Sequence, residues 1–190
     1  MGTSAEAIVI GASAGAVEAL SVILPSLPAD YEVPMLIVVH VPPDNKGILA
    51  QLFQAKCNIE VREAEDKEPI SDGTAYFAPP DYHLLVEPDK SLSLSSDAPV
   101  LFSRPSVDVL FESAADAYGA DLIAIVLTGA NEDGAEGLRA VADAGGTIIV
   151  QSPEGAYASA MPAAAIAACP NARVMSLEEI AAYLQDVEKT

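Results

Sequence analysis

The sequence is poor in cysteine, in basic residues and in long apolar runs. Its two cysteines, Cys57 and Cys169, lie far apart without metal-ligand spacing, so neither a disulfide framework nor a zinc site is indicated. No apolar run approaches the ~20 residues of a membrane span. No Lys or Arg precedes Lys46, so the charged start of a signal peptide is missing. We expect a soluble, cytoplasmic protein in a reducing compartment, with no bound metal.

The charge balance is strongly acidic. Nine basic residues stand against 28 acidic ones, which gives a formal net charge of −19. This charge repels nucleic acid and anionic membrane surfaces and argues against both as partners. Three origins of the charge remain open: a solvated surface that aids solubility, adaptation to salt, or recognition of a basic partner.

Length and pattern predict one α/β domain over residues 1–190. A chain of 190 residues, 51% of them hydrophobic and without a linker, can bury roughly 70% of its unfolded surface in one core. Short apolar runs alternate with helical patterns, which predicts a doubly wound, mostly parallel sheet with helices on both faces. Strands are expected at 8–10, 35–39, 59–61, 122–127 and 147–150. Helices are expected at 17–24, 45–56, after Pro105, after Gly134, at 161–168 and at 177–187.

The middle of the chain departs from this alternation. Three short β-rich runs, 74–78, 82–86 and 91–94, are separated by proline turns. They predict a small antiparallel hairpin or meander, inserted at one edge of the sheet. Pro105 is expected in the first turn of the helix that follows, where a missing N–H costs no hydrogen bond.

Three polar residues follow the carboxyl ends of predicted strands. Ser13 follows the first strand, His40 the second and Asp133 the most hydrophobic one. In open α/β sheets, sites are built at this edge, so the three side chains can converge. A serine hydroxyl needs an imidazole to take its proton, and the imidazole needs a carboxylate to fix its tautomer. The spacing Gly11-Ala-Ser-Ala-Gly15 is also that of a nucleophile elbow.

Each of these residues also has a structural interpretation. Ser13 suits a helix N-cap, Asp133 suits a cap of the next helix, and a histidine at a strand end is commonly structural. His83, the other histidine, is a rival base, or a packing and supporting residue within an apolar strand. A dinucleotide loop fails because the third glycine is missing after Gly11, and no P-loop lysine follows.

Several motifs together resemble the catalytic domain of the chemotaxis protein-glutamate methylesterases over about residues 7–185. The matching segments are Ile10–Gly15, His40–Pro43, Ala78–His83, Arg104–Phe111 and Leu127–Gly134. The resemblance implies Ser13 as nucleophile, His40 as general base and Asp133 as the acid that orients it. It also implies an oxyanion hole formed by the backbone N–H groups of Ala14 and Ala130.

The chain departs from the family pattern at three places. It has Ala14 where the family often has Thr, and Gly15-Ala16 where the family has two glycines. It has Gly129-Ala-Asn131 where the family has Gly-Met-Gly. None removes a member of the triad, and a backbone donor survives a side-chain change, so these departures bear on the substrate cleft. Better-known members carry an N-terminal receiver domain, and this chain begins at the catalytic part. A free-standing esterase and a fragment are both compatible with that start.

The resemblance implies hydrolysis of glutamate γ-methyl esters on the cytoplasmic helices of chemoreceptors, with glutamine deamidation as a second activity. No cofactor is required. Arg104, beside the predicted site, is expected either to hold substrate carboxylates or to anchor the adjacent helix. The rival functions are a small-molecule carboxylesterase and a non-catalytic signalling scaffold.

Overall fold

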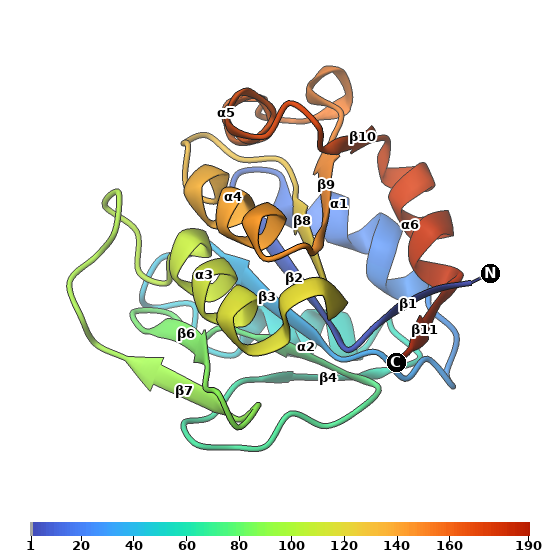
Figure 1. Ribbon diagram of the computed structural model, residues 1–190. Helices are drawn as coiled ribbons and strands as arrows, with labels where there is room; N and C mark the ends of the chain where they lie inside the picture. Colours follow the sequence, from blue (N-terminus) through green and yellow to red (C-terminus); the bar gives the residue numbers. More distant parts are fainter. Residues whose placement is uncertain (1) are drawn as a thin grey trace.

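The computed structural model describes residues 2–190 and is built around a seven-stranded sheet (Figure 1). The strand order is β10-β9-β8-β2-β3-β5-β4, and every pair of neighbours is parallel. The strands are β2 (Ala7–Ala12), β3 (Met35–Val39), β4 (Glu60–Glu63), β5 (Thr74–Phe77), β8 (Leu122–Val126), β9 (Thr147–Gln151) and β10 (Arg173–Met175). The predicted doubly wound fold is confirmed.

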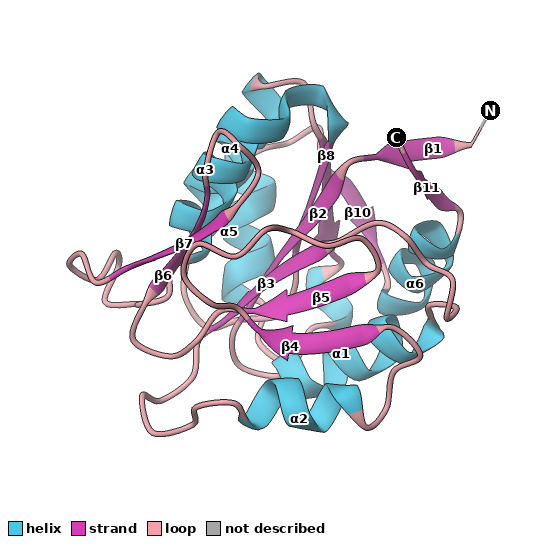
Figure 2. Cartoon of the chain, turned by 90° about the horizontal axis from the view of Figure 1, so that it is seen from below, coloured by secondary structure: helices cyan, strands magenta, loops and turns pink. Residues whose placement is uncertain are grey.

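Helices cover both faces of the sheet, as Figures 1 and 2 show. One face carries α1 (Ala16–Ile23), α2 (Ile48–Gln54) and α6 (Leu177–Gln185); the other carries α3 (Val107–Tyr118), α4 (Ala135–Asp143) and α5 (Ala160–Ala168). Short 3-10 turns occupy Leu24–Ser26, Gly119–Asp121 and Pro153–Gly155. Because side chains alternate along a strand, Ile8 and Ile10 of β2 join the first core, while Ala7 and Val9 join the second. Both faces of β2 are therefore buried.

The antiparallel insertion is smaller than predicted. Strands β6 (His83–Val86) and β7 (Leu92–Ser95) form a hairpin, as expected. The segment 74–78, however, does not belong to it, because β5 lies inside the parallel sheet between β3 and β4. The hairpin packs on α3, where the Val86 amide donates to Ser113 Oγ at 3.0 Å, and does not pair with an edge strand. The sequence pattern of β5 does not differ from that of the short β-rich runs that follow it, so the sequence did not indicate that β5 belongs to the parallel sheet.

The start of α3 also differs from the prediction. Pro105 follows a cis peptide bond after Arg104 and lies outside the helix, which begins at Val107 with Ser106 as its N-cap. The Asp133 carboxylate accepts the first two helical amides, those of Val107 and Asp108, at 2.7 and 2.9 Å. A side chain from a distant segment thus caps this helix.

A further strand pair joins the two ends of the described chain. Strand β1 (Thr3–Ala5) runs parallel to β11 (Val187–Lys189), as Figure 1 shows at the right. Neither strand was predicted, and α6 ends at Gln185 where a helix to residue 187 was expected. The start of α6 has a capping box: Ser176 Oγ accepts the Glu179 amide, and Glu179 Oε2 accepts the Ser176 amide.

Candidate active site

The sheet register brings Ser13 and His40 to neighbouring positions. Ala12 and Val39 are paired at the ends of β2 and β3, and the His40 amide donates to the Ala12 carbonyl at 3.2 Å. The residues that follow, Ser13 and His40, therefore leave the sheet side by side. Strand β8 flanks β2 on its other side, and the Ser13 amide donates to the Thr128 carbonyl beyond β8 at 2.9 Å. Ser13 thus lies between the two segments that carry the predicted partners.

Ser13 stands on a tight turn and does not cap α1. The N-cap of α1 is Gly15, and no side chain caps the helix. Gly15 has φ of 84°, and a Cβ there would lie 2.6 Å from Tyr157 Cβ, so both its conformation and its surroundings require glycine. The capping interpretation of Ser13 is wrong. Ser13 is half-buried, and within residues 2–190 its hydroxyl makes no hydrogen bond, so it is available for another role.

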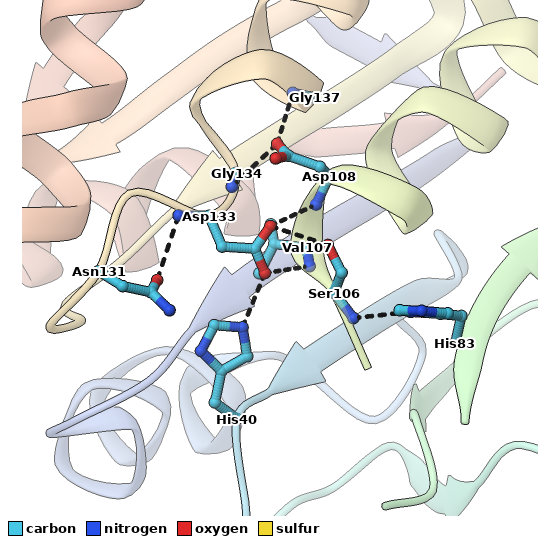
Figure 3. Close-up of polar contacts among 9 residues, drawn as sticks. All are labelled: His40, His83, Ser106, Val107, Asp108, Asn131, Asp133, Gly134 and Gly137. Atoms are coloured by element: carbon cyan, nitrogen blue, oxygen red, sulfur yellow. Dashed lines mark hydrogen bonds and ion pairs between the residues drawn. The ribbon is translucent and has the colours of Figure 1, made fainter. Parts of the chain in front are cut away.

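Asp133 is fully buried and accepts four hydrogen bonds, drawn in Figure 3. Its Oδ2 accepts from His40 Nε2 and from the Val107 amide, both at 2.7 Å, and its Oδ1 accepts from Ser106 Oγ and the Asp108 amide, both at 2.9 Å. Every partner is a donor, so the site suits an ionised carboxylate at the N-terminus of α3.

These bonds determine the charge of Asp133. Burial acts to raise its pKa, but the hydrogen bond from His40 and those from the Asp108 and Val107 amides outweigh it and lower the pKa below the ordinary value. Asp133 is therefore negative at neutral pH and can stabilise a positively charged imidazole.

The bond to Asp133 fixes the tautomer of His40. With Nε2 donating to Asp133 Oδ2, the ring proton lies on Nε2, and Nδ1 carries the lone pair that can accept a proton. Within residues 2–190 no hydrogen bond joins this ring to the Ser13 hydroxyl. Bonds between a nucleophile and its base are often loose before substrate binds.

His83 cannot serve as a general base in this structure. It is 2% exposed, its Nδ1 accepts the Ser106 amide at 3.1 Å, and its Nε2 donates to the Ala98 carbonyl at 3.0 Å. Both ring nitrogens are occupied. The supporting role predicted as the alternative describes it correctly, because His83 holds the residue whose hydroxyl donates to Asp133 (Figure 3).

Arg104 lines a cavity of about 350 Å³ beside His40, together with Pro42, Asp81 and Phe102. Its guanidinium donates twice to Asp81 Oδ1 and once each to the Ser96 and Asp97 carbonyls. Most of its donors are thus used within the 96–105 loop and to hold that loop to Asp81. These contacts are to Asp81 and to the loop before α3, not to the helix that Arg104 was expected to anchor, and one guanidinium donor remains for a substrate.

The amides of Ala14 and Ala130 are available at the same edge. Among residues 2–190, neither N–H donates to another backbone group. The Ala14 amide follows Ser13 directly, and Ala130 lies in the segment that follows β8. Two free N–H donors near a serine are what an oxyanion hole requires.

Asp108 is a second buried carboxylate at this site that the sequence did not reveal. Its Oδ1 accepts the Gly134 and Gly137 amides at 2.9 and 2.7 Å, which joins α3 to the start of α4 (Figure 3). Burial raises its pKa to about 6 against the effect of the Gly137 hydrogen bond, and the charge of Asp133 adds to the rise.

Asp108→Asn should therefore stabilise the protein at neutral pH. Since the folded pKa lies above the unfolded value of ~3.9, stability falls as pH rises from about 4 to 6 and stays lower above that range. Asparagine keeps an oxygen acceptor and removes the charge. In thermal melts, the variant's gain in free energy of unfolding over the parent should be about 1–3 kcal/mol larger at pH 7.5 than at pH 4.5. Asp116→Asn, exposed on the same helix, is the control, and equal gains for both variants would contradict the assignment.

The described residues contain no candidate metal site. Between residues 2 and 190, no three His, Cys, Asp or Glu side chains lie together in a way that could bind a metal ion. No helix in the same range has both the length and the apolar character needed to cross a membrane.

A parallel α/β sheet that presents a serine, a histidine and a buried aspartate at one edge has the arrangement of a serine hydrolase. The family model described as CheB methylesterase matches residues 8–184, and this chain belongs to that family. The crystal structure of the Thermotoga maritima CheB methylesterase catalytic domain superposes with a TM-score of 0.91 at 32% identity, over 96% of this chain and 98% of that one.

Curated relatives agree with this assignment. A Leptospira interrogans protein is 48% identical over 176 residues, which are 93% of this chain and 91% of the relative. The Archaeoglobus fulgidus protein-glutamate methylesterase/protein-glutamine glutaminase is 38% identical over 162 residues, which are 84% of this chain and 46% of the relative. The chain thus spans nearly all of the first relative and about half of the second.

Proposed function

We propose that this chain hydrolyses glutamate γ-methyl esters on the cytoplasmic helices of chemoreceptors and releases carboxylate and methanol. Family membership over residues 8–184 supports the ester chemistry, and the relatives' names support protein glutamate methyl esters as the substrate class and glutamine deamidation as a second activity. The observation that carries the proposal is the 2.7 Å bond from His40 Nε2 to Asp133, with Ser13 and His40 following the paired residues Ala12 and Val39 at the strand ends. The protein would act in the cytoplasm, where these helices lie.

The chemistry follows from the tautomer of His40. As Ser13 Oγ attacks the ester carbonyl, His40 Nδ1 takes the hydroxyl proton, and the imidazolium is stabilised by Asp133. The oxyanion forms beside the Ala14 and Ala130 amides. His40 then gives the proton to the departing methoxide, which leaves an acyl-serine. Water activated by His40 releases the glutamate and restores Ser13. No metal or cofactor takes part in these steps.

Methanol release from a radiolabelled methylated receptor tests the proposal. The purified chain should release labelled methanol from the receptor and should also cleave a small chromogenic ester. Cleavage of the small ester without methanol release would identify a small-molecule esterase. The absence of both activities in a folded protein would leave a signalling scaffold.

Two matched histidine variants test the choice of base. His40→Gln removes the lone pair at Nδ1 and should lower ester hydrolysis at least ~10³-fold. His83→Gln keeps a buried amide that can bond to Ala98 and Ser106, and should retain hydrolysis within about tenfold, with a lower melting temperature. Rates of hydrolysis of the same small chromogenic ester, measured for both variants and the parent under identical conditions, give the comparison. An inactive His83→Gln together with an active His40→Gln would reverse the assignment.

A further inference from the structure

Thr128 is a buried polar residue with no part in the proposed chemistry. It follows β8 and is 1% exposed. Its Oγ1 donates to the Ala14 carbonyl at 2.8 Å and accepts the Ala158 amide at 2.9 Å. The Ala158 carbonyl lies farther from Oγ1, at 3.2 Å, and a hydroxyl has one proton, so we assign that proton to Ala14. One side chain thus ties the Ser13 turn to the 158 segment.

The contacts of Thr128 surround the first oxyanion amide. A peptide unit is planar, so a bond to its carbonyl also fixes the direction of its N–H. The unit that carries the Ala14 amide is held by the bond from the Ala16 amide to the Ser13 carbonyl at 3.0 Å. The preceding unit is held by the bond from the Ser13 amide to the Thr128 carbonyl, and the following unit by the Thr128 hydroxyl. Thr128 therefore bonds to the peptide units before and after the unit that carries the Ala14 N–H, the first through its carbonyl and the second through its hydroxyl.

The second oxyanion amide depends on the same segment. The Gly129 amide donates to the Ala158 carbonyl, and the Met161 amide donates to the Gly129 carbonyl, both at 3.0 Å. The latter bond fixes the plane that carries the Ala130 N–H. The Thr128 hydroxyl bonds to Ala14, after β2, and to the Ala158 amide, in the segment that holds Gly129. It therefore connects the backbone segments that carry the Ala14 and Ala130 amides.

We propose that Thr128 is a positioning residue that fixes the spacing of the Ala14 and Ala130 amides, and so their stabilisation of the oxyanion. The proposal rests on the proposed serine-esterase function. Thr128 does not touch the reacting atoms; it acts through the Ala14 and Ala158 backbone. Loss of its hydroxyl should weaken transition-state stabilisation and leave ground-state binding nearly unchanged, because the oxyanion exists only in the transition state.

Thr128→Val tests this role, since valine keeps the shape and both branches but has no hydroxyl. We expect kcat for a small chromogenic ester to fall about 10- to 100-fold with KM within about threefold, the loss typical of a displaced catalytic donor. Thr128→Ser, which keeps the hydroxyl, should restore kcat to within about threefold of the parent. Inhibition by a boronic acid, whose adduct with Ser13 mimics the oxyanion, should weaken with the same factor as kcat.

Thr74→Val is the matched control. Thr74 is 2% exposed in β5, and the one hydrogen bond of its Oγ1 within residues 2–190 is to the nearby Asp72 carbonyl, so this variant loses a buried hydroxyl away from the site. It should lower the melting temperature by less than Thr128→Val does, because no buried amide loses its acceptor, and it should leave kcat unchanged. Equal kcat in Thr128→Val and the parent, or equal kcat losses in Thr128→Val and Thr74→Val, would overturn the positioning role. Activity on the small ester without methanol release from receptor would refute the proposed substrate and leave this comparison intact.

Discussion

Ser13→Ala is expected to abolish ester hydrolysis and leave the fold unchanged. The hydroxyl is half-buried, makes no capping bond and is replaced by a residue type already present on both sides of it, Ala12 and Ala14. The backbone bonds of residue 13, to Thr128 and from Ala16, do not involve the side chain. Loss of a nucleophile typically lowers kcat ~10⁴-fold or more, since only the oxyanion hole and binding remain.

The measurement is kcat on a small chromogenic ester, with methanol release from methylated receptor as the second assay. Ser21→Ala serves as the control, because Ser21 lies in α1 and, among residues 2–190, its hydroxyl bonds to the Val17 carbonyl of the same helix alone. The free energy of unfolding of both variants should lie within about 0.5 kcal/mol of the parent's, as is usual for changes away from the core. Hydrolysis by Ser13→Ala within tenfold of the parent would remove Ser13 from the mechanism.

The convergence of Ser13, His40 and Asp133 could be predicted from sequence for a specific reason. Each follows an apolar run that ends at the same edge of a parallel sheet, and parallel strands bring their carboxyl ends together. The edge of the sheet on which each residue lies follows from this pattern, whereas the strand order, which places β8 and β3 on either side of β2, does not. The 2.7 Å bond between His40 and Asp133, 93 residues apart in sequence, follows from this topology.

The residues that support the site could not be predicted in this way. Ser106 and Asp108 donate to Asp133 from the start of α3, and nothing in their local pattern distinguishes them from an ordinary helix N-terminus. Thr128 acts through backbone groups that carry no sequence signal. The Arg104–Phe111 motif forms part of the family resemblance, but its contact with Asp133 depends on how α3 lies against the 127–134 segment.

Errors in the fold have a similar cause. Strand β5 is four residues long and lies among other short β-rich runs, so its partners were assigned by proximity in sequence. Its actual neighbours are β3 and β4, because Ala75 pairs with both Met35 and Val61. Strands β1 and β11 have three residues each and pair across the whole chain, which no local periodicity can indicate.

Asp133→Asn is expected to remove activity and also to lower stability. The carboxylate accepts from four donors, whereas an asparagine side chain turns two of its lone-pair positions into N–H donors. If the amide oxygen keeps Ser106 and Asp108, the amide nitrogen faces the Val107 amide and His40 Nε2. His40 can then bond only by accepting at Nε2, which moves its proton to Nδ1 and removes the base. Loss of the correct tautomer typically lowers kcat ~10⁴-fold.

The stability loss has a separate origin and provides a second readout of the same variant. The Val107 amide is left buried without an acceptor, which costs about 1–3 kcal/mol, and the negative charge at the N-terminus of α3 is lost. The melting temperature and kcat on the small ester should both fall in Asp133→Asn. Asp143→Asn, which changes an exposed residue at the end of α4, should alter neither. His40→Gln separates the two effects, because it leaves both amide bonds to Asp133 intact and should lose activity with a much smaller change in melting temperature. An Asp133→Asn protein that keeps kcat within tenfold of the parent would show that the carboxylate acts only as a cap for α3.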